Sequence, residues 1–192
     1  MEILEGSYGG RKGLDGMDAV DTLYANTRNN PIEDIESHLP LRVSRYELRD
    51  QAPAKGRWRG GIGSIREFAF LSQGAFSVEG EGHKYRPWGF DGGADGSTAS
   101  LSLRLATGDE KTLPSKVPYR GASSGDRLIA VGPNGGGYGD PLERDPEAVL
   151  SDMLDGYIST ELAEADYCVV IRGKSLDVAA TDALRASAAA AK

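Results

Sequence analysis

The chain has 192 residues, a formal net charge of −7, one cysteine and 26 glycines. Glycine is nearly twice as frequent as the usual share of about 7%. Because glycine destabilises the interior of helices and strands but fits tight turns, this composition excludes a helical bundle and favours short strands joined by turns. The acidic charge argues against nucleic acid as a partner, and no stretch approaches the roughly 20 apolar residues of a membrane helix. We therefore expect a single cytoplasmic domain over residues 1–192, without an internal disulfide.

Residues 1–40 are expected to form an irregular arm, because closely spaced glycines interrupt a polar run. A short helix is expected at 31–36, with Asn30 as its N-cap and Pro31 at its first position. Glu33 would then lie in the first turn, close to the positive end of the helix dipole.

Residues 41–133 are expected to form a β-rich core. The apolar residues of 41–48 alternate, but their phase shifts between Val43 and Tyr46, which predicts a β-bulge. The leucines of 100–105 alternate strictly with polar residues, which predicts a strand with one buried face. A further strand is expected at 127–131. Together these patterns predict an α+β fold, mainly antiparallel β and resembling a sandwich or a barrel, with helices at its C-terminal end.

Residues 145–192 change to a helical pattern. Asp145, Ser159 and Asp177 each stand where they can cap a helix, and the last helix is expected to run to about residue 191. Gly156 provides a stop for the first of these helices. Between the second and third, the apolar run 167–171 is expected to form a buried strand, with Cys168 as a structural thiol rather than a nucleophile.

Two histidines are the first candidates for chemistry. His83 lies beside Arg86 and Trp88 in a glycine-flanked stretch, where it could bind an anion or act as an acid; the alternative is a turn at a strand end with Trp88 in the core. His38 follows two glutamates and could form an acidic cluster with them, or stand on a solvated turn. Neither histidine has a second ligand at the spacing of a zinc site.

Two glycine-rich loops resemble ligand-binding motifs only in part. Residues 132–141 lie between a strand and a helix, where phosphate-binding loops occur, but they lack the lysine and the spacing of such loops. Residues 91–97 resemble a calcium loop but have no bidentate acid at the twelfth position, so a turn is expected there.

Seven stretches, in order along the chain, resemble the C-terminal region of the hydantoinase B/oxoprolinase family. They include an Asp-Gly pair, an Asn-Thr…Pro-Ile-Glu stretch and a run of three glycines. The stretches are 9–18, 26–43, 46–49, 56–63, 86–93, 135–141 and 155–159. Each string is short, but their common order over nearly the whole chain makes the resemblance specific.

The resemblance implies a subunit of an ATP-dependent enzyme that opens cyclic amides such as hydantoins or 5-oxoproline. Two alternatives stay open, namely a subunit of an ATP-dependent acetone or acetophenone carboxylase, and a non-catalytic structural subunit of such a complex. In the family, a hydantoinase A-type partner binds ATP, and the metal-binding His and Asp residues lie in the N-terminal part of the B-type subunit. We therefore expect no cofactor or metal on this chain alone, and ATP with Mg and a divalent metal (Zn, Mn or Fe) in partner subunits.

Family members usually have several hundred residues, so this chain resembles only about their last third. The initial methionine and the capped last helix favour a naturally split subunit over a fragment, with a separate chain supplying the N-terminal part. On this basis His83 and Arg86 are expected to handle charge or protons. Asn26, Asn29 and Glu33 are expected to position loops near substrate or partner.

Overall fold

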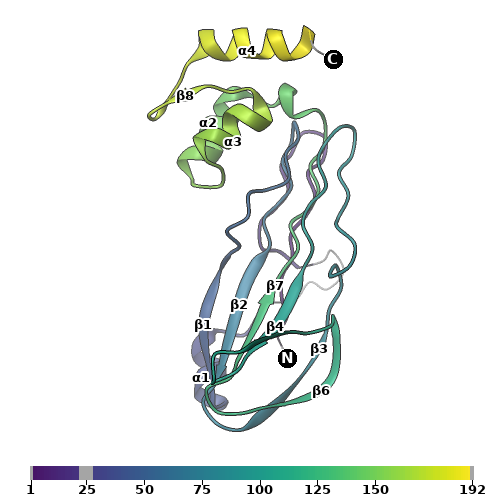
Figure 1. The fold of residues 1–192 in the computed structure, drawn as a ribbon, viewed down its shortest axis with the longest axis vertical. Helices are drawn as coiled ribbons and strands as arrows, with labels where there is room; N and C mark the ends of the chain where they lie inside the picture. The colour runs from purple at the N-terminus through teal and green to yellow at the C-terminus, as the bar shows by residue number, and fades with distance from the viewer. Residues whose placement is uncertain (1, 22–27, 191–192) are drawn as a thin grey trace.

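The structure is a computed structural model that describes residues 2–21 and 28–190. Five strands form one antiparallel sheet in the order β1-β2-β7-β4-β5, and two more form a separate antiparallel pair (Figure 1). The strands of the sheet are β1 (Leu41–Leu48), β2 (Ser64–Phe70), β4 (Ser100–Arg104), β5 (Glu110–Thr112) and β7 (Arg127–Val131); the pair is β3 (Gly74–Glu79) with β6 (Lys116–Ala122). The expected fold class, mainly antiparallel β with C-terminal helices, is confirmed.

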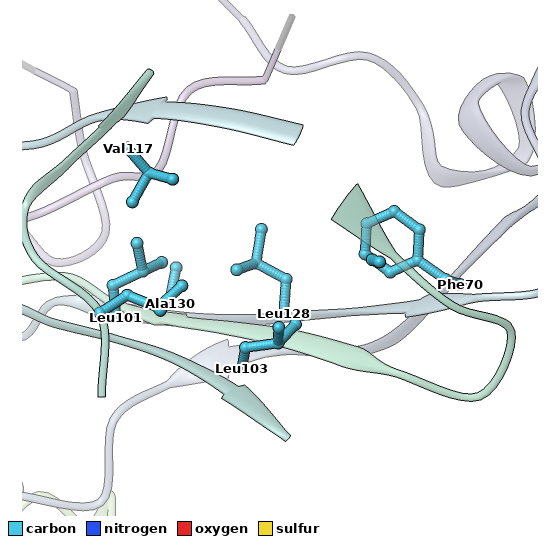
Figure 2. Close-up of a cluster of buried hydrophobic side chains, with 8 residues drawn as sticks. Phe70, Leu101, Leu103, Val117, Leu128 and Ala130 are labelled. Carbon is cyan, nitrogen blue, oxygen red and sulfur yellow. The ribbon is translucent and has the colours of Figure 1, made fainter. Parts of the chain in front are cut away.

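The apolar core lies between the sheet and the β3–β6 pair. Leu101 and Leu103 of β4 are almost fully buried, and Val117 of β6 faces them from the other layer (Figure 2). The remaining members come from β2, β6, β7 and the segment after β5: Phe70, Leu113, Ala122, Leu128 and Ala130. The strict alternation in 100–105 therefore identified a strand that buries one face and exposes the other.

Of two local expectations in the first half of the chain, the β-bulge is confirmed and the N-cap of the first helix is wrong by one residue. The register of β1 against β2 shifts between Val43 and Arg45, so the predicted β-bulge is present. Helix α1 (Ile32–His38) begins one residue later than expected: Pro31 is its N-cap, and Asn30 lies before it. Proline at the cap leaves the helix without a side-chain cap, and the acidic first turn is its remaining favourable feature.

The C-terminal part is helical, as predicted. The elements are η1 (Pro141–Glu143), α2 (Pro146–Leu154), α3 (Thr160–Tyr167), β8 (Ile171–Arg172), β9 (Ser175–Leu176) and α4 (Val178–Ala190). Asp145, Ser159 and Asp177 accept hydrogen bonds from backbone N–H groups of the helices that follow them, so all three caps are confirmed. Gly156 follows α2 with a φ of +81°, the left-handed conformation that ends a helix.

The buried strand expected at 167–171 is wrong. Tyr167 is the last residue of α3, and Cys168 takes the left-handed conformation that ends this helix. The apolar residues of the stretch still pack together, because Tyr167 and Val169 belong to a second core beneath α2 and α3. A short apolar run satisfies a helix end as well as a strand, so periodicity could not separate the two.

Between the sheet and the helices lie extended segments without regular strands, which we call the glycine array: residues 8–16, 54–63, 87–96 and 132–139 (Figure 1). They are held by backbone hydrogen bonds between segments, such as Gly10 N to Gly136 O (2.8 Å) and Phe90 N to Gly137 O (2.9 Å). These bonds place segments far apart in sequence side by side.

Segment 132–139 lies at the centre of the array. A Cβ built on Gly135 would collide with the carbonyl of Tyr8, one on Gly136 with that of Trp88, and one on Gly137 with that of Lys55. Three consecutive residues therefore face three different neighbours. A strand alternates between two sides, whereas a polyproline II helix has three residues per turn and presents three. As at the crowded axis of collagen, only glycine fits at such close backbone approaches.

Candidate functional site

A half-open cavity of about 430 Å³ lies between the N-terminal arm, the start of α1 and the β1–β2 pair. Its wall mixes apolar and polar side chains, and the polar ones include two arginines, two acids and two asparagines. The lining residues are Ile3, Glu5, Ala19, Val20, Asp21, Arg28, Asn29, Asn30, Pro31, Ile32, Tyr46 and Arg66.

Glu5 is the centre of the hydrogen-bond network in this wall. Its carboxylate is buried and accepts from the amide of Asn29, from the hydroxyl of Tyr46 at 2.8 Å and from the hydroxyl of Ser64 at 3.2 Å. Asn29 in turn accepts from the N–H of Ile3 at 2.9 Å. Asn29 therefore fixes the arm against the strands, which is a positioning role.

Arg66, on β2, is the most deeply buried cation of the described chain, with 1% of its surface exposed. Its guanidinium lies 4.0 Å above the ring of Tyr46, and Nη1 donates to Glu2 at 2.7 Å. Nε and Nη2 have no hydrogen-bond partner. Since buried donors are normally paired, Arg66 leaves polar capacity unused at this cavity.

The structure places the predicted site residues in separate regions. Asn29 lines the cavity, whereas Glu33 lies on the exposed side of α1 and is absent from the cavity wall. Asn26 lies outside the described residues. His83 and Arg86 belong to the loop between β3 and β4, and neither lines the cavity.

His83 is partly buried and Arg86 is exposed. Burial lowers the pKa of His83 from its ordinary value of 6.5, and the nearby charge of Glu81 opposes this shift only in part. The lowered pKa favours the neutral imidazole, which is the form that can accept a proton. The alternative that placed Trp88 in the core is wrong, because 69% of this side chain is exposed.

A group of buried and half-buried charged side chains, which the sequence did not reveal, joins the glycine array to the C-terminal helices. Arg144 holds Asp15 through two parallel bonds of 2.7 and 2.8 Å and also donates to Asp152 at 2.8 Å. Arg59 bonds the other oxygen of Asp152 at 3.2 Å and pairs with Asp18 at 3.0 Å. We call these five residues the charged clasp.

The electrostatics of the clasp follow from burial and proximity. Burial tends to raise the pKa of Asp15, but the hydrogen bond and charge of Arg144, together with Arg59, outweigh it and hold this pKa below 3.8. Arg59 also stacks over the ring of Tyr157 at 4.6 Å. The acids come from the arm and from α2, so no spacing in the sequence predicted the cluster. The Asp-Gly pair at 15–16 was the one part of it that a sequence motif singled out.

Neither ligand-like loop is built for its ligand. Four glycines of 132–141 face backbone carbonyls in the array and serve as packing positions: Gly132, Gly135, Gly136 and Gly137. Residues 91–97 form the expected turn, in which Asp95 accepts from the N–H of Gly89 at 2.9 Å. Over residues 2–21 and 28–190, no group of three His, Cys, Asp or Glu side chains could hold a metal ion. In the same ranges, no helix is long and apolar enough to cross a membrane.

Comparison with known proteins decides the family. The family model of hydantoinase B/oxoprolinase matches residues 1–141. The chain belongs to this family. It is 64% identical over 187 residues to the B-type subunit of the "Putative D-/L-hydantoinase" of Pseudomonas sp. (strain NS671), an alignment that covers 96% of this chain and 32% of the relative.

Two solved structures share the fold of this hydantoinase B-family chain. The ATP-dependent caprolactamase from Pseudomonas jessenii superposes with a TM-score of 0.79 at 31% identity, over 95% of this chain and 33% of that one. A nucleotide-free acetone carboxylase superposes with a TM-score of 0.75 at 20% identity, over 98% of this chain and 30% of that one. The chain thus spans about a third of the length of the relatives it matches.

Proposed function

We propose that this chain is one third of a B-type subunit in an ATP-dependent enzyme that hydrolyses cyclic amides of the hydantoin type. The observation that carries the proposal is the 64% identity to a B-type hydantoinase subunit over nearly the whole chain. The likeness to an ATP-dependent caprolactamase supports the same chemistry, because a caprolactam is also a cyclic amide.

The chain acts in this proposal as one domain of a complex in the cytoplasm. Its partners are a hydantoinase A-type subunit and the polypeptide that corresponds to the other two thirds of the B-type subunit. ATP with Mg and a divalent metal (Zn, Mn or Fe) bind to these partners.

The roles of the five candidate residues differ in this complex. Asn29 positions the arm through Glu5 and Ile3, and Asn26 and Glu33 position the neighbouring segments near substrate or partner. His83, in its neutral form, accepts a proton, and Arg86 binds a negative charge. These roles require the partner chains, because His83 and Arg86 do not line the cavity next to Asn29.

The test is ATP turnover by the reconstituted complex of the A-type subunit, this chain and the remaining B-type polypeptide. We expect hydantoin or a lactam to stimulate ATP hydrolysis and amide cleavage. Stimulation only by acetone or acetophenone with bicarbonate would identify a ketone carboxylase instead, and stimulation by neither class would reject both enzymes.

Substitutions separate a catalytic from a structural contribution. His83→Ala and Arg86→Ala are expected to reduce turnover while the complex still assembles; His83→Ala should also change the pH profile of the rate. Lys111→Ala is the matched control, because it removes an exposed charge on β5, outside the loop that carries both candidate side chains. Unchanged turnover in both alanine variants would support a purely structural subunit.

A further inference from the structure

One face of the glycine array carries a row of aromatic side chains. Tyr138 exchanges two backbone hydrogen bonds with Trp58 on one side and lies opposite Phe90 on the other, where Phe90 bonds Gly137 and Gly139. Residues paired in this way project their side chains to the same side. The rings of Trp58 and Tyr138 accordingly lie 5.7 Å apart, and Arg57 stacks on Trp58 at 4.7 Å.

The outer end of this row is open to solvent. Phe90 is 58% exposed and Trp88, two residues earlier, is 69% exposed. Beside the row lies a hollow of about 290 Å³. Its wall combines the two inner aromatic rings with charged side chains and consists of Lys12, Arg57, Trp58, Asp91, Tyr138, Gly139, Asp140 and Glu143. Aromatic residues and arginine are enriched at protein interfaces.

The backbone that presents these aromatic residues is held firmly. Phe90 donates to Gly137 and accepts from Gly139, both at 2.9 Å. Pro87 accepts from Gly96 at 2.7 Å, and the carbonyl of Trp88 lies against Gly136. Large aromatic side chains on a fixed backbone lose little conformational freedom on binding, which is why such residues dominate binding energy at interfaces.

The length of the relatives identifies the occupant. This chain corresponds to 32% of a B-type hydantoinase subunit and to 33% of a solved caprolactamase chain, so in both relatives about two thirds of the polypeptide lies outside the matched part. Building on the proposed function, we propose that Trp88, Phe90 and the adjoining hollow form the docking surface for that remaining B-type polypeptide.

The test is co-expression of tagged full chain with the remaining two thirds of the B-type hydantoinase subunit of Pseudomonas sp. (strain NS671). The dissociation constant of the purified complex is then measured by dilution. We expect Trp88→Ala and Phe90→Ala each to weaken association at least about tenfold, as truncation of a central aromatic anchor does.

Tyr119→Ala is the matched control. Tyr119 lies on β6 and is 77% exposed, so its truncation removes a comparable exposed ring from another part of the chain. We expect its effect on association to stay within about twofold. Thermal unfolding of each variant alone shows that a loss of association is not a loss of fold.

The remaining outcomes overturn the proposal in distinct ways. The docking surface is rejected if the Trp88→Ala/Phe90→Ala double variant associates as tightly as the unaltered chain. It is also rejected if Tyr119→Ala weakens association equally, or if no complex forms. If this chain instead associates with itself or with the A-type subunit alone, and the double variant loses that association, the surface belongs to another occupant. A complex that forms through this surface but shows no ATP-dependent amide cleavage would reject the proposed function and leave the docking surface intact.

Discussion

The β-sandwich and the glycine array of this chain are stabilised in opposite ways. The sandwich buries apolar side chains between two layers, whereas the array brings backbones together by having no side chains at the contact positions. An apolar core tolerates a side chain of different shape when its volume is kept, but a close backbone contact has no space for even one methyl group. The array should therefore be the part of the fold most sensitive to small substitutions.

The largest effect is expected at the centre of the array. Gly137→Ala places a methyl group against the carbonyls of Lys55 and Ala54, and we expect it to lower the free energy of unfolding by more than about 4 kcal/mol. Gly121→Ala is the matched control: Gly121 lies in β6 with only one atom, 4.0 Å away, near its added Cβ. Urea unfolding measures both; similar stabilities would refute the idea of backbone-to-backbone packing.

In the sandwich, Leu103→Ala should lower the free energy of unfolding by about 3 kcal/mol, because it leaves a cavity at a side chain that is 1% exposed. Leu103→Met, which keeps the volume, should have an effect below about 1.5 kcal/mol. If Leu103→Met lowers the free energy of unfolding as much as Gly137→Ala in the same urea titration, the proposed difference between the sandwich and the array is refuted.

The charged clasp tests how the array is joined to the helices. Asp152→Asn removes the negative charge between Arg59 and Arg144, two buried cations, and should cost about 3 kcal/mol. Glu147→Gln, on the exposed side of the same helix, is the control and should change stability by less than about 0.5 kcal/mol. Backbone amides of α2 and α3 should exchange hydrogen faster in Asp152→Asn than in the unaltered chain. Equal exchange rates would show that the clasp does not join the array to these helices.

The smallest effect concerns the acid dependence of the same clasp. The pKa of Asp15 is below 3.8 in the folded chain, so the unfolded chain binds more protons than the folded chain near that pH. Asp15 thus contributes stability above about pH 4, and this contribution is lost as the pH falls through the folded pKa. Because the side chain is 36% exposed, Asp15→Asn should cost only about 1 kcal/mol at pH 7.

The variant should also flatten the decline of stability between about pH 5 and pH 3. Thermal unfolding over that range checks both statements. Parallel acid profiles for the variant and the unaltered chain would show that Asp15 titrates with its ordinary pKa.

Prediction from the sequence succeeded where one segment carries its own signal. The alternating leucines of β4, the phase shift in β1 and the capping side chains of α2, α3 and α4 each depend on a few neighbouring residues. It failed at 167–171, where a short apolar run fits a helix end and a strand equally well, and at Trp88, whose hydrophobicity suggested burial.

The candidate site was predictable only in part, for a related reason. Asn29 was singled out by its motif, but its contact with Glu5 spans 24 positions of the chain. The partners of Arg144 come from the arm and from α2, and no spacing rule connects Asp15 to a residue 129 positions away. The row from Trp58 through Tyr138 to Phe90 likewise exists only because three distant segments lie side by side.

By itself the sequence determined the fold class, the caps of the three C-terminal helices and, through seven ordered stretches, the family. The 26 glycines indicated turns, because composition records the freedom of the backbone and nothing about its neighbours. Only the tertiary structure decided that many of them stand at backbone contacts. A glycine required by close approach and one required by a turn look alike in sequence, and they differ only in what a Cβ would meet.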